Sequence, residues 1–224
     1  MEAYLDANKG VTASAGAVGT WVAQDAGARS FSQATGANKP VQTAGVFGAL
    51  PSIRFVAEQW VRAASQSTQA AGVSWFHVTK WTSARATVTN VNNVPLTIFG
   101  NSTGGVYNAS GASNGAIAYQ QYIAAANQYT RGSGFNDGAA RLLGWVHDPA
   151  GTLKAYAGTA QQGATLTGIT YSTTFGGYDS IGSAQANVDG ISGDIGAVVS
   201  VTGIISAGDL TKLNAWAQQR FGTP

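Results

Sequence analysis

His147 and Asp148 are the residues of this chain whose types could most directly do chemistry, because a histidine beside a carboxylate can serve as an acid–base pair. They lie in the segment GWVHDPAGTLKAYAG, in a chain that has only two histidines. The segment also fits a strand, a turn and a returning strand, with Pro149 and Gly151 at the second and fourth turn positions. An aspartate that begins a turn bonds its own backbone two residues on, so we interpret the pair as a turn.

A nucleophile motif occurs at GASNG, where Ser113 fits G-x-S-x-G. Asp137 and His147 follow it in the chain order of α/β-hydrolases. That motif requires a sharp turn between a buried strand and a helix, whereas the flanking sequence here is polar and rich in glycine. We therefore do not expect a serine hydrolase.

Oxygen ligands for a cation occur in NVDGISGD, which places Asn187, Asp189 and Asp194 near turn carbonyls. Such oxygens suit calcium, although a turn without metal explains the same residues. His77 has no second histidine or carboxylate at ligand spacing, so we expect a structural role for it. The chain has no cysteine, which excludes disulfides and thiolate chemistry. We expect no cofactor, with calcium as the one possible exception.

The charge and hydropathy of the sequence argue against nucleic-acid and membrane partners. The net charge is +2, and the 12 basic residues are scattered along the chain without a patch beside aromatics, so we expect no nucleic-acid partner. The first residues, MEAYLDANKG, lack the basic start and apolar run of a secretion signal. The longest apolar run, IGAVVSVTGII, is too short and too broken to span a bilayer, so we expect no membrane insertion.

Short alternating or β-branched runs, separated by Gly, Asn, Ser and Pro, predict a single all-β domain of the sandwich or jelly-roll type over residues 1–224. The expected strands are PSIRFVA, VSWFHVTKW, RATVTNV, PLTIFGN, RLLGWVHD, TLKAYAG, ATLTGITYS and DIGAVVSV.

One short α-helix is expected at the C-terminus. Ser206 is a good N-cap, with Asp209 three residues later, and Gly222 occupies the position of a left-handed C-cap. The residues between them form an apolar stripe at helical spacing: Leu210, Leu213 and Ala217, with Trp216 at its edge. We expect this helix to pack on the outside of the sandwich.

Residues 102–137 form a long segment rich in Gly, Asn and Tyr, which we interpret as an insertion. Within it, AIAYQQYIAAANQY fits a helix by its alanines and a strand by its tyrosines. Exposed tyrosines suit sugar rings, and they suit protein interfaces equally well. The candidate carbohydrate- or partner-binding residues are Tyr107, Tyr119, Tyr122 and Tyr129.

The chain resembles the laminin-G-like branch of the concanavalin A-like lectin/glucanase superfamily. The C-terminal motifs are the Trp145–Gly158 hairpin, TTFGGYDSIGS, SGDIGAVVSV and the capped helix. The N-terminal motifs are YLDANKGVTASAGAVGTW and SQATGANKPVQTAGVFGALPSIRF. The resemblance implies a concanavalin A-like β-sandwich, and laminin-G-like domains often hold calcium at their rims.

Glucanases of this superfamily carry an E-x-D-x-x-E strand, and glycoside hydrolysis generally needs two carboxylates. Glu2 and Glu58 are the only glutamates, and the motif is absent from the sequence. We therefore expect no catalytic residues and no enzyme; a glycan-cleaving activity would require carboxylates distant in sequence to converge.

The expected function is structural or adhesive. A domain without signal, anchor, coiled coil or stalk suits a bacteriophage virion protein, either capsid decoration or tail-associated, exposed on the particle surface. Its expected partners are other virion proteins, further copies of itself in a homo-oligomer, and host-surface glycans. The alternative is a stand-alone, lectin-like carbohydrate-binding module.

Overall fold

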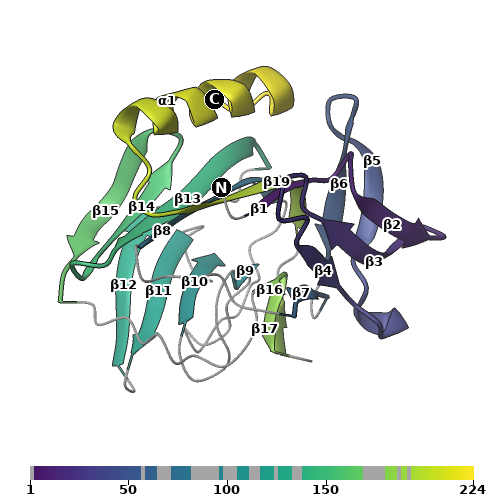
Figure 1. The fold of residues 1–224 in the computed structure, drawn as a ribbon, viewed down its shortest axis with the longest axis horizontal. Coiled ribbons are helices and arrows are strands. Elements are labelled where there is room, and N and C mark those ends of the chain that lie inside the picture. The colour runs from purple at the N-terminus through teal and green to yellow at the C-terminus, as the bar shows by residue number, and fades with distance from the viewer. Residues whose placement is uncertain are drawn as a thin grey trace.

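A computed structural model describes residues 3–56, 59–64, 72–81, 96–97, 105–110, 117–123, 126–132, 138–168, 180–185, 188–190 and 193–224. The expected strand RATVTNV lies outside these residues, as do Ser113, Asp137 and Asn187. The chain is a mostly antiparallel β-sandwich with one C-terminal helix, which confirms the predicted fold class (Figure 1). Among the described residues, no helix has the length and apolar character needed to cross a membrane.

The larger sheet has 13 strands, as far as the described residues define it. Its centre consists of β13 (Ala140–Asp148), β8 (Val73–Trp81) and β19 (Gly193–Thr202). Next to β13 lie β14 (Thr152–Ala157) and then β15 (Ala160–Leu166), which forms one edge of the sheet. On the side away from β8, β19 pairs with β1 (Ala3–Asp6) and β6 (Leu50–Phe55). From β6 the order is β5 (Val41–Phe47), β3 (Ala17–Val22), β4 (Ser30–Ser32), β7 (Val61–Ala63) and β16 (Ser180–Ile181), while β2 (Val11–Ser14) pairs with β3. The 3-10 helix η1 (Gly36–Asn38) lies between β4 and β5.

A smaller sheet lies on the side of the larger sheet opposite the helix (Figure 1). It consists of β9 (Leu96–Thr97), β10 (Gly105–Ser110), β11 (Ile117–Ile123) and β12 (Ala126–Gly132). Strand β12 contacts β15 and β14, and β9 contacts β16 and β17 (Ser183–Gln185), the partner of β18 (Val188–Gly190). The ambiguous stretch AIAYQQYIAAANQY therefore contributes two strands, and much of the 102–137 segment belongs to this sheet.

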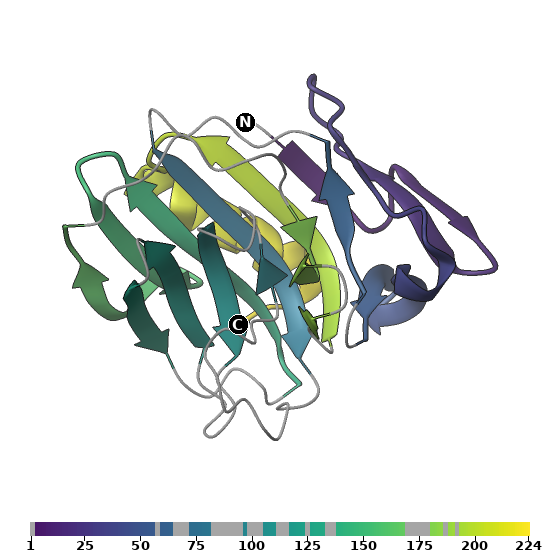
Figure 2. The same cartoon turned by 90° about the horizontal axis from the view of Figure 1, so that it is seen from below.

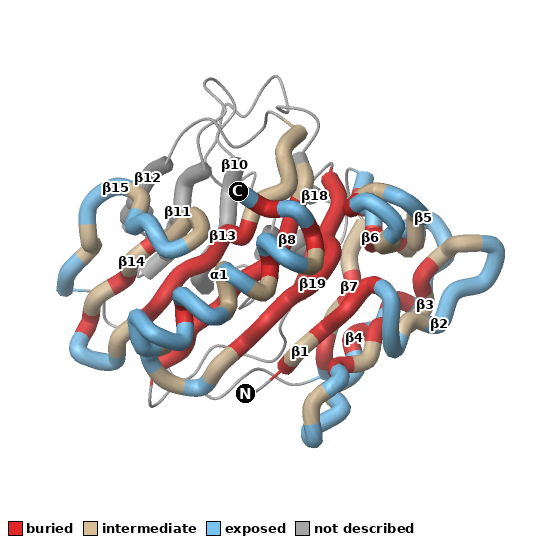
Figure 3. The backbone as a smooth tube through the Cα atoms, turned by 90° about the horizontal axis from the view of Figure 1, so that it is seen from above, coloured by how far each residue is buried: buried red, intermediate tan, exposed pale blue. Residues whose placement is uncertain are grey.

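The central strands of the larger sheet are buried on both faces (Figure 3). Inward-facing residues, among them Trp75, Trp145 and Leu143, form the core between the sheets. Their neighbours on the outward face, among them Phe76 and Val146, form a second apolar layer under the helix. The helix is therefore one of the covering layers that this sheet requires.

Helix α1 (Ala207–Phe221) has the predicted caps. The Asp209 backbone N–H donates to the Ser206 hydroxyl at 3.1 Å, and that hydroxyl donates to the Asp209 carboxylate at 2.8 Å. Gly222 takes the left-handed conformation, and its N–H donates to the Gln218 carbonyl at 3.0 Å. The buried residues of the helix are Leu210, Ala217 and Phe221, and Leu213 and Trp216 pack beside them.

The β13–β14 hairpin confirms that Asp148 begins a turn. Its carboxylate accepts the Ala150 backbone N–H at 2.8 Å, and its carbonyl accepts the Gly151 N–H at 2.9 Å. His147 then pairs with Leu153 across the hairpin.

Gly144, at the centre of β13, allows the aromatic layer under α1 to form. A Cβ atom at this position would overlap the Phe76 ring and the Trp75 carbonyl. The missing side chain therefore leaves space that the Phe76 ring occupies.

We predict that Gly144→Ala lowers the free energy of unfolding by about 2 kcal/mol, because overpacking a rigid core forces its neighbours to shift. Gly208→Ala is the matched control, since its Cβ would have the Ser206 hydroxyl 3.9 Å away. Urea unfolding of both variants measures the difference. Equal stability of Gly144→Ala and the native chain would show that the Phe76 layer adapts freely.

Candidate functional site

The candidate tyrosines lie on three adjacent strands of the smaller sheet. Tyr107 of β10 pairs with Gln120 of β11, and Gln120 pairs with Tyr129 of β12. On its other side, Tyr107 pairs with Thr97 of β9. The register thus places two of the tyrosines in one cross-strand row, on either side of a glutamine.

The register also decides which face of the sheet each remaining tyrosine occupies. Tyr122 lies two residues after Gln120, so it shares the face of Tyr107 and Tyr129. Tyr119 pairs with Asn108 and Thr130 in the neighbouring row, and it belongs to the opposite face. We call the first face the tyrosine face; it holds Tyr107, Tyr122 and Tyr129.

The two faces differ in composition. Residues on the tyrosine face include the polar Thr97, Gln120, Asn127 and Arg131. The opposite face, with Tyr119, holds the aliphatic Leu96, Val106, Ile117 and Ile123. It also holds polar residues, namely Asn108, Ser110, Gln121, Gln128 and Thr130. Because the Leu, Val and Ile residues of these strands all lie on one face, we expect that face to pack on the core and the tyrosine face to meet solvent. In the view from below, no described helix or strand lies in front of β10–β12 (Figure 2).

Both histidines are buried inside the larger sheet. His77 lies between Leu143 and Val198 in the register, and burial lowers its pKa to about 3. His147 is 1% exposed; its burial lowers the pKa to about 4, against the opposing charge of Asp148. Each imidazole is therefore neutral at neutral pH, and the His147–Asp148 pair belongs to a hairpin whose histidine is closed to substrate.

Of the residues predicted to bind calcium, Asp194 is the one whose side chain the structure describes. Asp194 is 1% exposed, and its carboxylate accepts hydrogen bonds from the Ser52 hydroxyl at 2.6 Å and the Arg54 Nη2 at 2.9 Å. Asp189 lies on β18, and Asn187 is outside the described residues. Within the described part of the chain, no group of three or more His, Asp or Glu residues could hold a metal ion. The calcium site stays a prediction.

No family model and no curated protein matches this sequence. Solved structures do match it. Domain 4 of AbnA, a GH43 extracellular arabinanase from Geobacillus stearothermophilus solved in complex with arabinotriose, is similar at a TM-score of 0.64 and 14% identity. The match covers 95% of this chain and 97% of that domain.

Two toxin domains are also similar. The receptor binding domain of a botulinum neurotoxin C/D mosaic serotype matches at a TM-score of 0.70 and 10% identity, over 100% of this chain and 54% of that chain. The binding domain of Paraclostridial Mosquitocidal Protein 1 matches at a TM-score of 0.62 and 8% identity, over 100% of this chain and 55% of that chain. This chain thus spans about half of each toxin domain, and at these identities the likeness shows a shared β-sandwich fold.

We predict that acid destabilises this protein through its two histidines. Below pH 6.5 the unfolded imidazoles take up protons, whereas the folded ones stay neutral until the pH approaches about 4 for His147 and about 3 for His77. The unfolded state therefore binds more protons, and stability present above pH 6.5 is lost as the pH falls. Between pH 6.5 and its folded pKa, each histidine should lower the free energy of unfolding by about 1.4 kcal/mol for each pH unit.

Urea unfolding at pH 7.5, 6.0 and 5.0 measures how the free energy of unfolding changes with pH. NMR titration of the two imidazoles shows the pKa of each histidine in the folded protein. Imidazole signals that titrate near pH 6.5 in the folded protein would contradict this account, because a histidine that protonates normally contributes no such slope.

Proposed function

We propose that this chain is a non-catalytic module that binds oligosaccharides on the tyrosine face. The observation that carries the proposal is the strand register, which gathers Tyr107, Tyr122 and Tyr129 on the face of the smaller sheet that has no Leu, Val or Ile among its described residues. The likeness to AbnA domain 4, which extends over nearly all of both chains, supports it because that domain was solved with arabinotriose. A structure of botulinum neurotoxin type C, similar at a TM-score of 0.58 and 15% identity over 96% of this chain and 51% of that chain, belongs to a toxin whose cell entry depends on interaction with two ganglioside molecules, which also fits a glycan ligand.

The chemistry of this face suits sugars. Aromatic rings provide flat apolar surfaces for the C–H faces of sugar rings, and amide side chains both donate and accept hydrogen bonds to hydroxyls. Gln120 and Asn127 supply two amides among the three tyrosines. Tyr107 and Tyr129 lie two strand spacings apart, about 10 Å, which favours an oligosaccharide over a single ring.

Two buried carboxylates of the larger sheet are unsuited to catalysis. Asp6 and Asp194 are buried, and each is bonded to an arginine, so neither is available to attack or protonate a glycosidic bond. Glu2 and Glu58 lie outside the described residues. Glycoside hydrolysis would need two carboxylates on either side of one bond.

A structural role in a viral particle, as a capsid decoration or tail-associated protein at the particle surface, is the second candidate. Tyrosine is enriched at protein interfaces, so the tyrosine face would then contact another virion protein or another copy of this chain. The experiment that follows separates the two functions.

We predict that the purified chain binds neutral oligosaccharides on a glycan array, and that Tyr107→Ala and Tyr129→Ala each weaken binding about tenfold or more. Truncating an aromatic anchor at the centre of a binding face typically has an effect of this size. Tyr119→Ala is the matched control, since it belongs to the opposite face. It should lower the melting temperature and leave the affinity of the folded fraction unchanged.

Two outcomes would overturn the proposal. Loss of binding in Tyr119→Ala, with Tyr107→Ala and Tyr129→Ala unaffected, would place the ligand elsewhere. A blank array would favour the particle role, which concentration-dependent self-association of the native chain would then support.

A further inference from the structure

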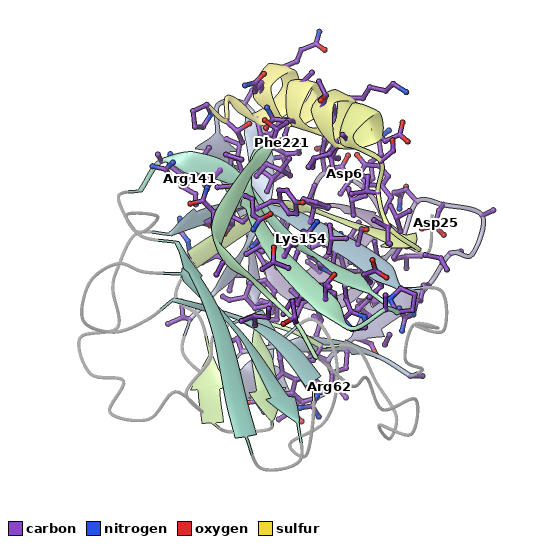
Figure 4. All side chains as sticks on the ribbon, turned by 90° about the vertical axis from the view of Figure 1, so that its left-hand side faces the viewer. Asp6, Asp25, Arg62, Arg141, Lys154 and Phe221 are labelled. Atoms are coloured by element: carbon purple, nitrogen blue, oxygen red, sulfur yellow. The ribbon has the colours of Figure 1, made fainter. Side chains whose placement is uncertain are left out.

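The tyrosine face belongs to the sheet that lies away from α1. Figure 4 shows the strands of the smaller sheet on the far side of the molecule from the helix and Phe221. Strands β9 to β12 pair in antiparallel order, so residues opposite one another form rows that run across the strands. Positions in one row are about 4.8 Å apart, whereas successive positions of one face along a strand are about 7 Å apart. The register therefore fixes the spacing of the positions on this face.

One row of the tyrosine face crosses all four strands. Its members, in strand order, are Thr97, Tyr107, Gln120 and Tyr129. The two tyrosine positions of this row are therefore two strand spacings apart, about 10 Å, and the glutamine position lies midway between them. The row thus alternates a polar residue with an aromatic one.

Along the strands, no two tyrosines of the described residues share this face. On β10, the positions of the same face before and after Tyr107 are Gly105 and Ala109. Tyr122 and Tyr129 are likewise the one tyrosine of this face on β11 and on β12. A ligand that contacts both Tyr107 and Tyr129 must therefore cross the strands.

The spacing of Tyr107 and Tyr129 matches the repeat of one class of sugar chain. In an extended β-1,4-linked chain of glucose or mannose, successive rings are turned over relative to one another, so every second ring presents the same face. The two-ring repeat of such a chain has the length of two strand spacings. The first and third rings can then pack on the two tyrosines, and the hydroxyls of the second ring meet the Gln120 amide, which both donates and accepts hydrogen bonds.

The twist of a β-sheet favours a single chain over a crystalline surface. Adjacent strands are rotated relative to one another by roughly 20–25°, so positions two strands apart do not lie in one plane. A single sugar chain can follow this rotation by turning about its linkages. The flat face of a crystalline polysaccharide cannot, because its chains are held in register by their neighbours.

We propose that the ligand of the tyrosine face is a single, extended β-1,4-linked chain of neutral hexoses that crosses the strands along this row. Tyr107 and Tyr129 contact two rings that are separated by a third, and Gln120 binds the ring between them. The site therefore requires at least three rings and selects the linkage that places alternate rings at this spacing. The inference rests on the proposed function, since it names the sugar that the same face binds.

Titration calorimetry of the native chain with five soluble sugars tests the length and the linkage. The probes are cellobiose, cellotriose, cellotetraose, maltotetraose and arabinotriose. Cellotriose and cellotetraose should bind about tenfold more tightly than cellobiose, because two rings can reach only one tyrosine anchor. Cellotetraose should exceed maltotetraose and arabinotriose by a similar factor, and crystalline cellulose should not retain the protein.

A double variant tests the spacing itself. Gln120→Tyr combined with Tyr129→Gln keeps the composition of the row but moves the second tyrosine to one strand spacing from Tyr107. It should bind cellotetraose about tenfold more weakly, at the level of cellobiose. Tyr119→Gln combined with Gln121→Tyr makes the same exchange on the opposite face and is the matched control. Its folded fraction, measured by circular dichroism, should bind cellotetraose with native affinity.

The outcomes separate failure of this inference from failure of the proposed function. If all five sugars bind equally, or if only other neutral sugars bind on the array, the inference is wrong and the proposed function stands. Native affinity of the Gln120→Tyr, Tyr129→Gln variant for cellotetraose, or retention on crystalline cellulose, would also overturn the inference. If no neutral oligosaccharide binds, both the inference and the proposed function are rejected.

Discussion

The burial of β13, β8 and β19 on both faces is the constraint on which the rest of this structure depends. A strand buried on both sides needs a layer above and a layer below. Helix α1 supplies one layer, and the smaller sheet lies on the other side (Figure 1). The same constraint keeps both histidines neutral and requires a glycine at position 144, where the Phe76 ring occupies the space of a side chain.

Asp6 connects the N-terminal strand to this layered centre. Its carboxylate accepts the Tyr4 hydroxyl at 3.1 Å and Arg220 of the helix at 2.7 Å, and its carbonyl accepts the Trp21 indole at 3.0 Å. The burial of Tyr4 and the adjacent carboxylate raise the pKa of Tyr4 to about 12. One residue thus fixes β1, β3 and the helix end relative to one another.

Local sequence predicted those elements whose signals are local. The capped helix, the strand VSWFHVTKW and the Asp148 turn each contain their own pattern of caps, alternation or turn residues, and the structure has all three. The stretch around Tyr119 and Tyr122 stayed ambiguous, because alanine and tyrosine satisfy two periodicities and its pairing partners determine its strand conformation. Separating Tyr119 from the other tyrosines required the register.

Oligosaccharide binding by the tyrosine face is the property that most needs a direct test. The most direct test is backbone NMR of the native chain, titrated with the neutral oligosaccharide that gives the strongest array signal. We predict that the shifted amides belong to β10, β11 and β12, on residues in register with Tyr107 and Tyr129. Shifts confined to α1 and the β5–β6 turn, or none at saturating sugar, would contradict the account.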